Sequence, residues 1–179
     1  NRKGIDALKW TIPPVNLYEK KLRMLAAALG PTYIRVSGTW ANAVYFQDND
    51  EPKLAKAPEG YKNVLTRQQW KGVLDFCKAT NGKLVTSFSI CDGMRDKDGN
   101  WSPNQLQSLL NYTKSVGGEI ATAEMFNEPS HAGHGDAPKG YNGASFSKDF
   151  AAFKKYISVA APEIKIMGPG STGEGGILT

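Results

Sequence analysis

Helical segments and short apolar runs alternate along this chain, and the alternation constrains its fold more than any other feature. The spacing of apolar residues predicts a helix before each short strand. The expected order is helix 17–29, strand 32–37, helix 67–79, strand 83–90, helix 103–115, strand 119–127, helix 144–160 and strand 163–167. Strands separated by helices pair in parallel through right-handed crossovers. The sequence therefore predicts an α/β fold built from consecutive parallel units.

Helix-breaking residues mark where these helices begin and end. Gly30-Pro31, Asn81-Gly82 and Gly117-Gly118 follow the first three helices, and Ser102-Pro103 supplies an N-cap followed by proline. The connections from helix to strand are then short, whereas those from strand to helix are long, and residues 38–66 are expected to be an extended loop. In a (β/α)8 barrel the loops after the strands build the active site. We therefore expect functional residues at the carboxyl ends of the strands.

The number of predicted strands is too small for a closed barrel. An intact (β/α)8 barrel has about 250 residues, and this chain has 179. The sequence thus predicts a partial TIM barrel of about four consecutive parallel βα units, with residues 1–179 forming a fragment of one domain. Doubly wound sheets share the same alternation. Gly168-Pro169-Gly170 lacks the GxGxxG pattern of a phosphate-binding loop, and we expect no cofactor.

Charge and hydropathy exclude some classes of function. The net charge of +5 suits an acidic substrate but is too small for a nucleic-acid-binding surface. No apolar run reaches the roughly eighteen residues of a membrane span. The amino-terminal Asn1-Arg-Lys-Gly4 lacks the apolar region of a signal peptide. We expect a soluble chain, which is the mature form or a part of something longer.

The cysteines and histidines are not expected to form covalent or metal sites. Cys77 falls in a predicted helix and Cys91 beyond the following strand, about 20 Å away, too far for a disulfide. His131-x-x-His134 beside Asp136 is an arrangement that can bind a metal. Glycines flank it, however, and we expect a solvated loop and no metal site.

The tripeptide Asn127-Glu128-Pro129 is the strongest candidate for chemistry. It follows the apolar run 120–126 and places a carboxylic acid where a buried strand meets solvent. Such a position suits general acid/base catalysis. Asn and Pro are also common turn residues, so an ordinary junction between strand and loop is the alternative.

Three motifs follow or end predicted strands: Ile34-Arg-Val-Ser-Gly-Thr39, Phe88-Ser-Ile90 and Glu124-Met-Phe-Asn-Glu-Pro129. Together they resemble glycoside hydrolase family 79, the heparanase and β-glucuronidase family of clan A. Heparanases have Arg-aromatic-Gly-Gly-Thr at the first motif and Glu-Leu-Gly-Asn-Glu-Pro at the third. Asn-Glu-Pro alone is shared across the clan. The resemblance is collinear over nearly the whole chain.

The resemblance implies a retaining glycosidase, in which one carboxylate is the general acid/base and another the nucleophile. Glu128 matches the acid/base and Asn127 the residue that holds the 2-hydroxyl of the sugar. The family nucleophile follows the seventh strand, and no residue here is assigned to it. Glu174 is the only carboxylate after the fifth strand of the implied barrel, and its glycine-rich setting favours a plain loop. The isolated chain is therefore expected to be inactive and to need the remaining half of the barrel.

Other residues are assigned to substrate binding by the same resemblance. Arg35 matches an arginine that orients the nucleophile, and an ion pair with Glu124 is its structural interpretation. Gly38-Thr39 matches a segment that meets the substrate, and a turn is the alternative. Trp40 lies on a catalytic-face loop and can stack on a sugar or cover apolar surface. Lys62 matches a basic position beside the cleft, and a solvated lysine is the alternative.

The implied substrate is an anionic oligo- or polysaccharide, such as a β-glucuronide or another glycan that contains uronic acid. Two alternatives remain open. One is another clan A glycosidase, for instance an arabinofuranosidase, a xylosidase or a glucosylceramidase-like enzyme. The other is a noncatalytic glycan-binding relative. A secreted, periplasmic or otherwise extracytoplasmic location is expected, with no nucleic-acid partner.

Overall fold

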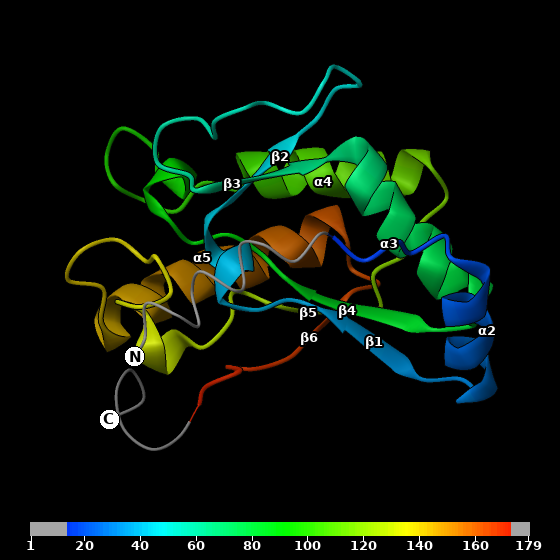
Figure 1. Ribbon diagram of the computed structural model, residues 1–179. Coiled ribbons are helices and arrows are strands. Elements are labelled where there is room, and N and C mark those ends of the chain that lie inside the picture. The colour runs from blue at the N-terminus through cyan, green and yellow to red at the C-terminus, as the bar shows by residue number, and fades with distance from the viewer. Residues whose placement is uncertain (1–13, 173–179) are drawn as a thin grey trace, which may run out of the picture.

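A parallel sheet of four strands forms the centre of the protein (Figure 1). The computed structural model describes residues 14–172. The strands are β1 (Tyr33–Val36), β4 (Lys83–Ser87), β5 (Thr122–Glu124) and β6 (Lys165–Ile166), in the spatial order β1-β4-β5-β6. Every neighbouring pair is parallel. The predicted consecutive parallel units are confirmed, and the arrangement is that of a partial TIM barrel.

Within residues 14–172, one α-helix precedes the first of these strands, and three more lie between successive strands of the sheet. They are α2 (Lys20–Ala28), α3 (Arg67–Ala79), α4 (Asn104–Ser115) and α5 (Gly143–Ala160). All four correspond to predicted helices. No helix within residues 14–172 is long and apolar enough to cross a membrane.

Side-chain caps explain where most of these helices begin. Helix α2 begins three residues later than predicted, because the Glu19 carboxylate accepts a hydrogen bond from the Leu22 N–H at 2.6 Å. Thr66 and Gln69 form a capping box at the start of α3. The predicted cap at Ser102 is wrong. Helix α4 begins at Asn104 with Pro103 at the N-cap position, so Ser102 lies one residue before the cap, although its hydroxyl accepts from the Asn104 N–H at 3.5 Å.

The segment 38–66 is not the uniform loop that its sequence predicts. It contains a short 3₁₀ helix, η1 (Thr39–Ala43), and two strands, β2 (Val44–Gln47) and β3 (Asn63–Thr66). The two strands pair in parallel as a small second sheet. Each has four residues, too few for a clear periodic pattern. The strands of the main sheet are also shorter than predicted.

The core lies between the main sheet and the helices. Leu84 and Ala123 of the sheet face a cluster that includes Phe153 and Ile157 of α5, all at most 1% exposed. The ring of Trp101 meets Phe153 edge to face, with 6.0 Å between centroids. Burial on this scale contributes about 2 kcal/mol for each large apolar side chain. It fixes the sheet on which the candidate site is built.

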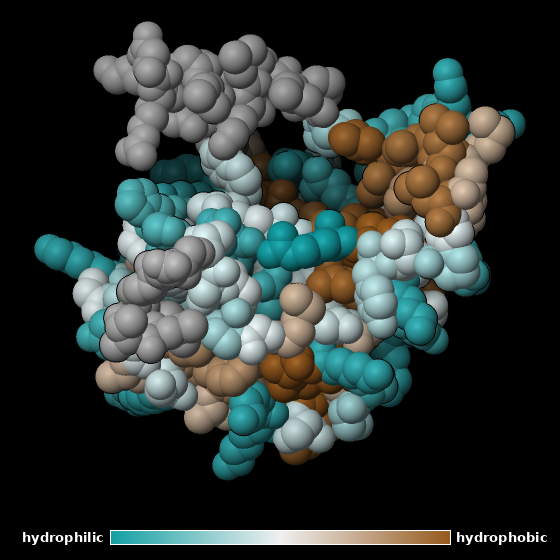
Figure 2. Space-filling model, turned by 90° about the horizontal axis from the view of Figure 1, so that it is seen from below, coloured by the Kyte–Doolittle hydropathy of each residue, from teal (hydrophilic) through white to brown (hydrophobic). Residues whose placement is uncertain are grey.

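One helix keeps an apolar face uncovered. Helix α2 has no buried residue, and Met24, Leu25 and Leu29 are 54–81% exposed. Figure 2 shows hydrophobic surface gathered on the side of the molecule where Figure 1 places α2. The adjacent strand β1 is an edge of the sheet. Among residues 14–172, nothing pairs with the free edge of β1 and no apolar side chain of α2 is buried.

The two cysteines are free, as predicted. Both are buried. Burial raises the pKa of the Cys91 thiol to about 11 and also raises the pKa of Cys77. Both thiols are thus protonated at neutral pH.

A buried ion pair joins the loop after β4 to α5. Arg95 Nη1 donates to Asp149 Oδ2 at 2.6 Å, and the two side chains are 12% and 5% exposed. The Tyr141 hydroxyl donates to the same oxygen at 3.1 Å. Burial, and then the nearby Asp149 charge, raise the pKa of Tyr141. The pair holds the loops that follow β4 and β5 against one helix.

We expect Asp149→Ala to lower the free energy of unfolding by about 3 kcal/mol, because it leaves the Arg95 charge buried without a carboxylate. Asp50→Ala is the matched control, since Asp50 pairs with Arg67 while its own side chain is 84% exposed. Urea unfolding of both variants measures the difference. Equal stability of the two variants would contradict the structural role of the buried pair.

Candidate active site

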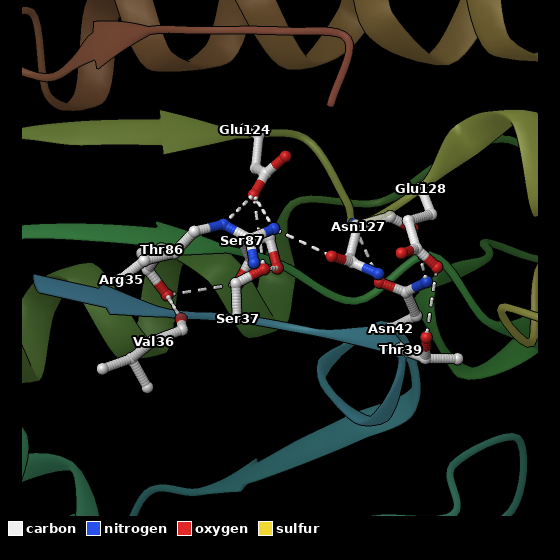
Figure 3. A network of polar contacts seen from close by, with 10 residues as sticks. All are labelled: Arg35, Val36, Ser37, Thr39, Asn42, Thr86, Ser87, Glu124, Asn127 and Glu128. Atoms are coloured by element: carbon white, nitrogen blue, oxygen red, sulfur yellow. Dashed lines mark hydrogen bonds and ion pairs between the residues drawn. The ribbon is translucent and has the colours of Figure 1, made fainter. Parts of the chain in front are cut away.

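Polar side chains gather at the carboxyl ends of β1, β4 and β5 (Figure 3). Ser87 is the register partner of Glu124, and its Oγ lies 2.5 Å from the Ser37 Oγ. The ends of parallel strands meet at one edge of a sheet, and in barrels this edge carries the active site. Residues far apart in the sequence are therefore brought into contact at the predicted edge.

Arg35 and Glu124 form the centre of this network. Arg35 Nε and Nη2 donate to Glu124 Oε1 at 3.0 and 2.5 Å. The predicted contact is present, but both donors converge on one oxygen and do not bind the two oxygens side by side. The Glu124 side chain is 1% exposed and that of Arg35 is 46% exposed. Within residues 14–172, Glu124 Oε2 is buried without a hydrogen-bond partner.

Arg35 also contacts Asn127. Its Nη2 donates to Asn127 Oδ1 at 2.8 Å. A guanidinium group can only donate, so this contact fixes the side-chain carbonyl of Asn127 toward Arg35. The amide NH₂ is then the part of Asn127 that remains for another acceptor.

Asn42 holds the backbone of Asn127, a role that no sequence pattern predicts. Its Nδ2 donates to the Asn127 carbonyl and its Oδ1 accepts from the Asn127 N–H, both at 2.9 Å. Asn42 is fully buried. It lies in η1, inside the segment predicted to be a loop. An asparagine in a loop is too common to be a signal by itself.

Glu128 leaves the strand in an unusual backbone conformation. Strand β5 ends at Glu124, three residues before the predicted end at residue 127, so Glu128 lies outside the strand. Glu128 has φ 55° and ψ 61°, the left-handed region, and Pro129 then begins η3 (Pro129–His131). Such a conformation costs a residue other than glycine about 1 kcal/mol or more. The half-buried carboxyl of Glu128 is 3.5 Å from the Thr39 hydroxyl, between Oε2 and Oγ1.

The other predicted substrate-binding residues surround this network. Gly38 has φ 132°, a conformation that side chains rarely allow, and it begins the turn that carries Thr39. Trp40 is 46% exposed on the same turn. Lys62 forms an ion pair with Asp136. That pair links the segment between β2 and β3 to the loop after β5.

The side chains of His131, His134 and Asp136 contact other protein groups. The rings of His131 and His134 meet edge to face at 6.3 Å, and Asp136 is engaged by Lys62. In the described part of the chain, no group of three or more His, Cys, Asp or Glu side chains is placed to hold a metal ion. Glu174, the later carboxylate, lies outside the described residues.

We expect Arg35→Ala to destabilise the protein more than Glu124→Gln does. The first change leaves a buried carboxylate without its charged partner, at a cost of about 3 kcal/mol. The second leaves a neutral amide whose oxygen still accepts from an exposed arginine. Urea unfolding of the two variants measures the asymmetry, and the reverse order would contradict the burial argument.

Comparison with known proteins adds two distant relatives. The chain is 25% identical to a heparanase of Bos taurus over 196 residues, which cover 86% of this chain and 35% of the relative. It is 24% identical to a hyaluronoglucuronidase of Hirudo nipponia over 185 residues, which cover 86% of this chain and 37% of the relative. No protein-family model matches the chain.

The chain spans about a third of the length of these two curated relatives. Both are named as enzymes that cleave glycans. The matches are distant, but they agree with the resemblance carried by the motifs at the ends of β1 and β5. Both the motifs and the two relatives point to a distant similarity to the heparanase family of glycoside hydrolases, family 79.

Proposed function

We propose that this chain is part of a retaining glycoside hydrolase that acts on β-glucuronides or other glycans containing uronic acid. The observation that carries the proposal is the position of Glu128, half-buried beside Asn127 and Thr39 at the carboxyl edge of a parallel sheet. The two relatives support a glycosidase and a polysaccharide substrate. An extracytoplasmic location stays a prediction.

Glu128 is the proposed general acid/base. In the first step its carboxylic acid protonates the glycosidic oxygen as the bond to the sugar breaks. In the second step the same carboxylate removes a proton from the attacking water. Asn127 is proposed to donate its amide N–H to the 2-hydroxyl of the sugar, an interaction that strengthens as positive charge develops on the ring. The contact from Arg35 to Asn127 Oδ1 leaves that amide N–H as the donor.

The second carboxylate is proposed to come from outside these 179 residues. Within the described residues, the exposed apolar side chains of α2 and the free edge of β1 support further barrel elements beside them. Arg35 and Lys62 are each paired with a carboxylate, Glu124 and Asp136, so the proposal of an anionic sugar is supported by the two relatives and not by an unpaired cation. The isolated chain is accordingly proposed to be inactive.

We expect Glu128→Ala, in the complete protein, to reduce cleavage of natural glycans by about 10²–10⁴-fold. Aryl glycosides with activated leaving groups should lose much less in the glycosylation step, because such groups depart without protonation. Azide should partly restore turnover by attacking the glycosyl-enzyme and giving a glycosyl azide of retained configuration. Steady-state kinetics and product analysis measure both effects.

Glu163→Ala is the matched control, since Glu163 is an exposed carboxylate between α5 and β6, remote from the carboxyl ends of the strands. It should leave both substrates unaffected. Comparing aryl glucuronides with aryl glycosides of neutral sugars tests the substrate class. Equal losses for natural and activated substrates in Glu128→Ala, without an azide product, would overturn the acid/base assignment.

A further inference from the structure

Asn42 connects three segments that end at the candidate site. Its side-chain amide binds both peptide groups of Asn127, and its own backbone carbonyl accepts the N–H groups of Ile90 and Cys91 at 2.9 and 3.2 Å. The segment after β1 is thereby tied to the ends of β4 and β5. Asn42 has no exposure to solvent. Water therefore does not compete for its hydrogen bonds, and a local opening of the structure is needed to break them.

The chemistry of the amide suits this position. Asn127 offers one donor and one acceptor from its own peptide groups, and a side-chain amide offers the complementary pair. An aliphatic side chain of similar size would leave both groups buried and unpaired. Asn127 lies three residues beyond the end of β5. There the two hydrogen bonds from the Asn42 side chain replace those that a neighbouring strand would make.

The residue held in this way is the one that directly precedes Glu128. The conformation of Glu128, with φ 55°, is one that non-glycine residues keep only where surrounding contacts determine it. Pro129 restricts the chain on one side of Glu128, and the Asn42 amide restricts it on the other. We propose that Asn42 is a positioning residue, which aims the Glu128 carboxyl by clamping the backbone of Asn127.

This inference rests on the proposed function. It predicts a specific kinetic signature for Asn42→Ala in the complete protein. A misplaced acid costs most where the leaving group needs a proton, so kcat for an unactivated glycoside should fall about 100-fold. The KM should change little, and an activated aryl glycoside should be affected far less. The ratio between the two substrates therefore shifts in the same sense as in Glu128→Ala.

Ser89→Ala is the matched control. Ser89 is buried; its Oγ accepts from the Val44 N–H at 3.0 Å and lies 2.7 Å from the Val44 carbonyl and 3.0 Å from the Ala41 carbonyl, either of which can accept its proton. It thus ties the same segment to the end of β4 without touching Asn127. This variant is expected to lower stability while leaving the ratio between the two substrates unchanged. If Asn42→Ala also leaves that ratio unchanged, the positioning role is overturned.

Amide hydrogen exchange gives a second measurement that is independent of activity. The Asn127 N–H should exchange at least about tenfold faster in Asn42→Ala than in Ser89→Ala. Unchanged exchange overturns the clamp. If the wild-type protein cleaves no glycoside, or if Glu128→Ala shows no dependence on the leaving group, the proposed function fails and the catalytic role of Asn42 fails with it. Exchange still decides whether the clamp exists, so the two failures are distinguishable.

Discussion

The buried carboxylate of Glu124 is the constraint on which the rim of this sheet depends. A carboxylate that is 1% exposed costs several kcal/mol unless a positive charge meets it. The charge comes from Arg35 on β1, and β4 lies between β1 and the strand β5 that carries Glu124. The pair therefore spans three strands and fixes their relative positions at the carboxyl edge. Ser37 adds a hydrogen bond of 3.3 Å to the same oxygen.

The same pair determines how polar groups face the site. Arg35 uses Nη2 both for Glu124 and for the side-chain carbonyl of Asn127. Because Asn127 is held through its side chain by Arg35 and through its backbone by Asn42, it has little freedom left. The structural and the functional interpretations of Arg35 are thus compatible. Neutralising a buried charge and orienting an amide are two consequences of one geometry.

Sequence patterns predicted the features that repeat. Helix spacing and breaker residues located the helices α2 to α5 of the described residues, and the alternation with strands predicted the parallel pairing. The pair of Arg35 with Glu124 followed from strand ends that meet at one edge. The features that sequence reasoning missed do not repeat. Strands β2 and β3 are too short to show a period, and the role of Asn42 depends on a contact 85 residues away in the chain.

The backbone conformation of Glu128 is another feature that the sequence patterns did not predict. Strand propensity carried the predicted strand through residue 127, but the apolar run continues past the end of pairing at Glu124. Met125 and Phe126 are buried outside the strand, at 3% and 1% exposure. Their hydrophobicity therefore reports burial and not extended structure. No local sequence pattern predicts a glutamate in the left-handed backbone region, because the tertiary contacts around it stabilise that conformation.

The contacts of Glu128 include the Thr39 hydroxyl and a hydrogen bond from the His131 N–H to the Glu128 carbonyl at 2.9 Å, whereas the groups that face outward are less constrained. Asn42, Asn127 and Glu124 are buried, but Arg35 and Trp40 are each 46% exposed. The position of the candidate acid/base is consequently determined by this chain itself. In the proposed function, recognition of a sugar would involve such exposed groups, and within residues 14–172 β1 is an edge strand and α2 has no buried residue. A barrel completed on that side would add the groups that select a substrate without having to build the acid/base.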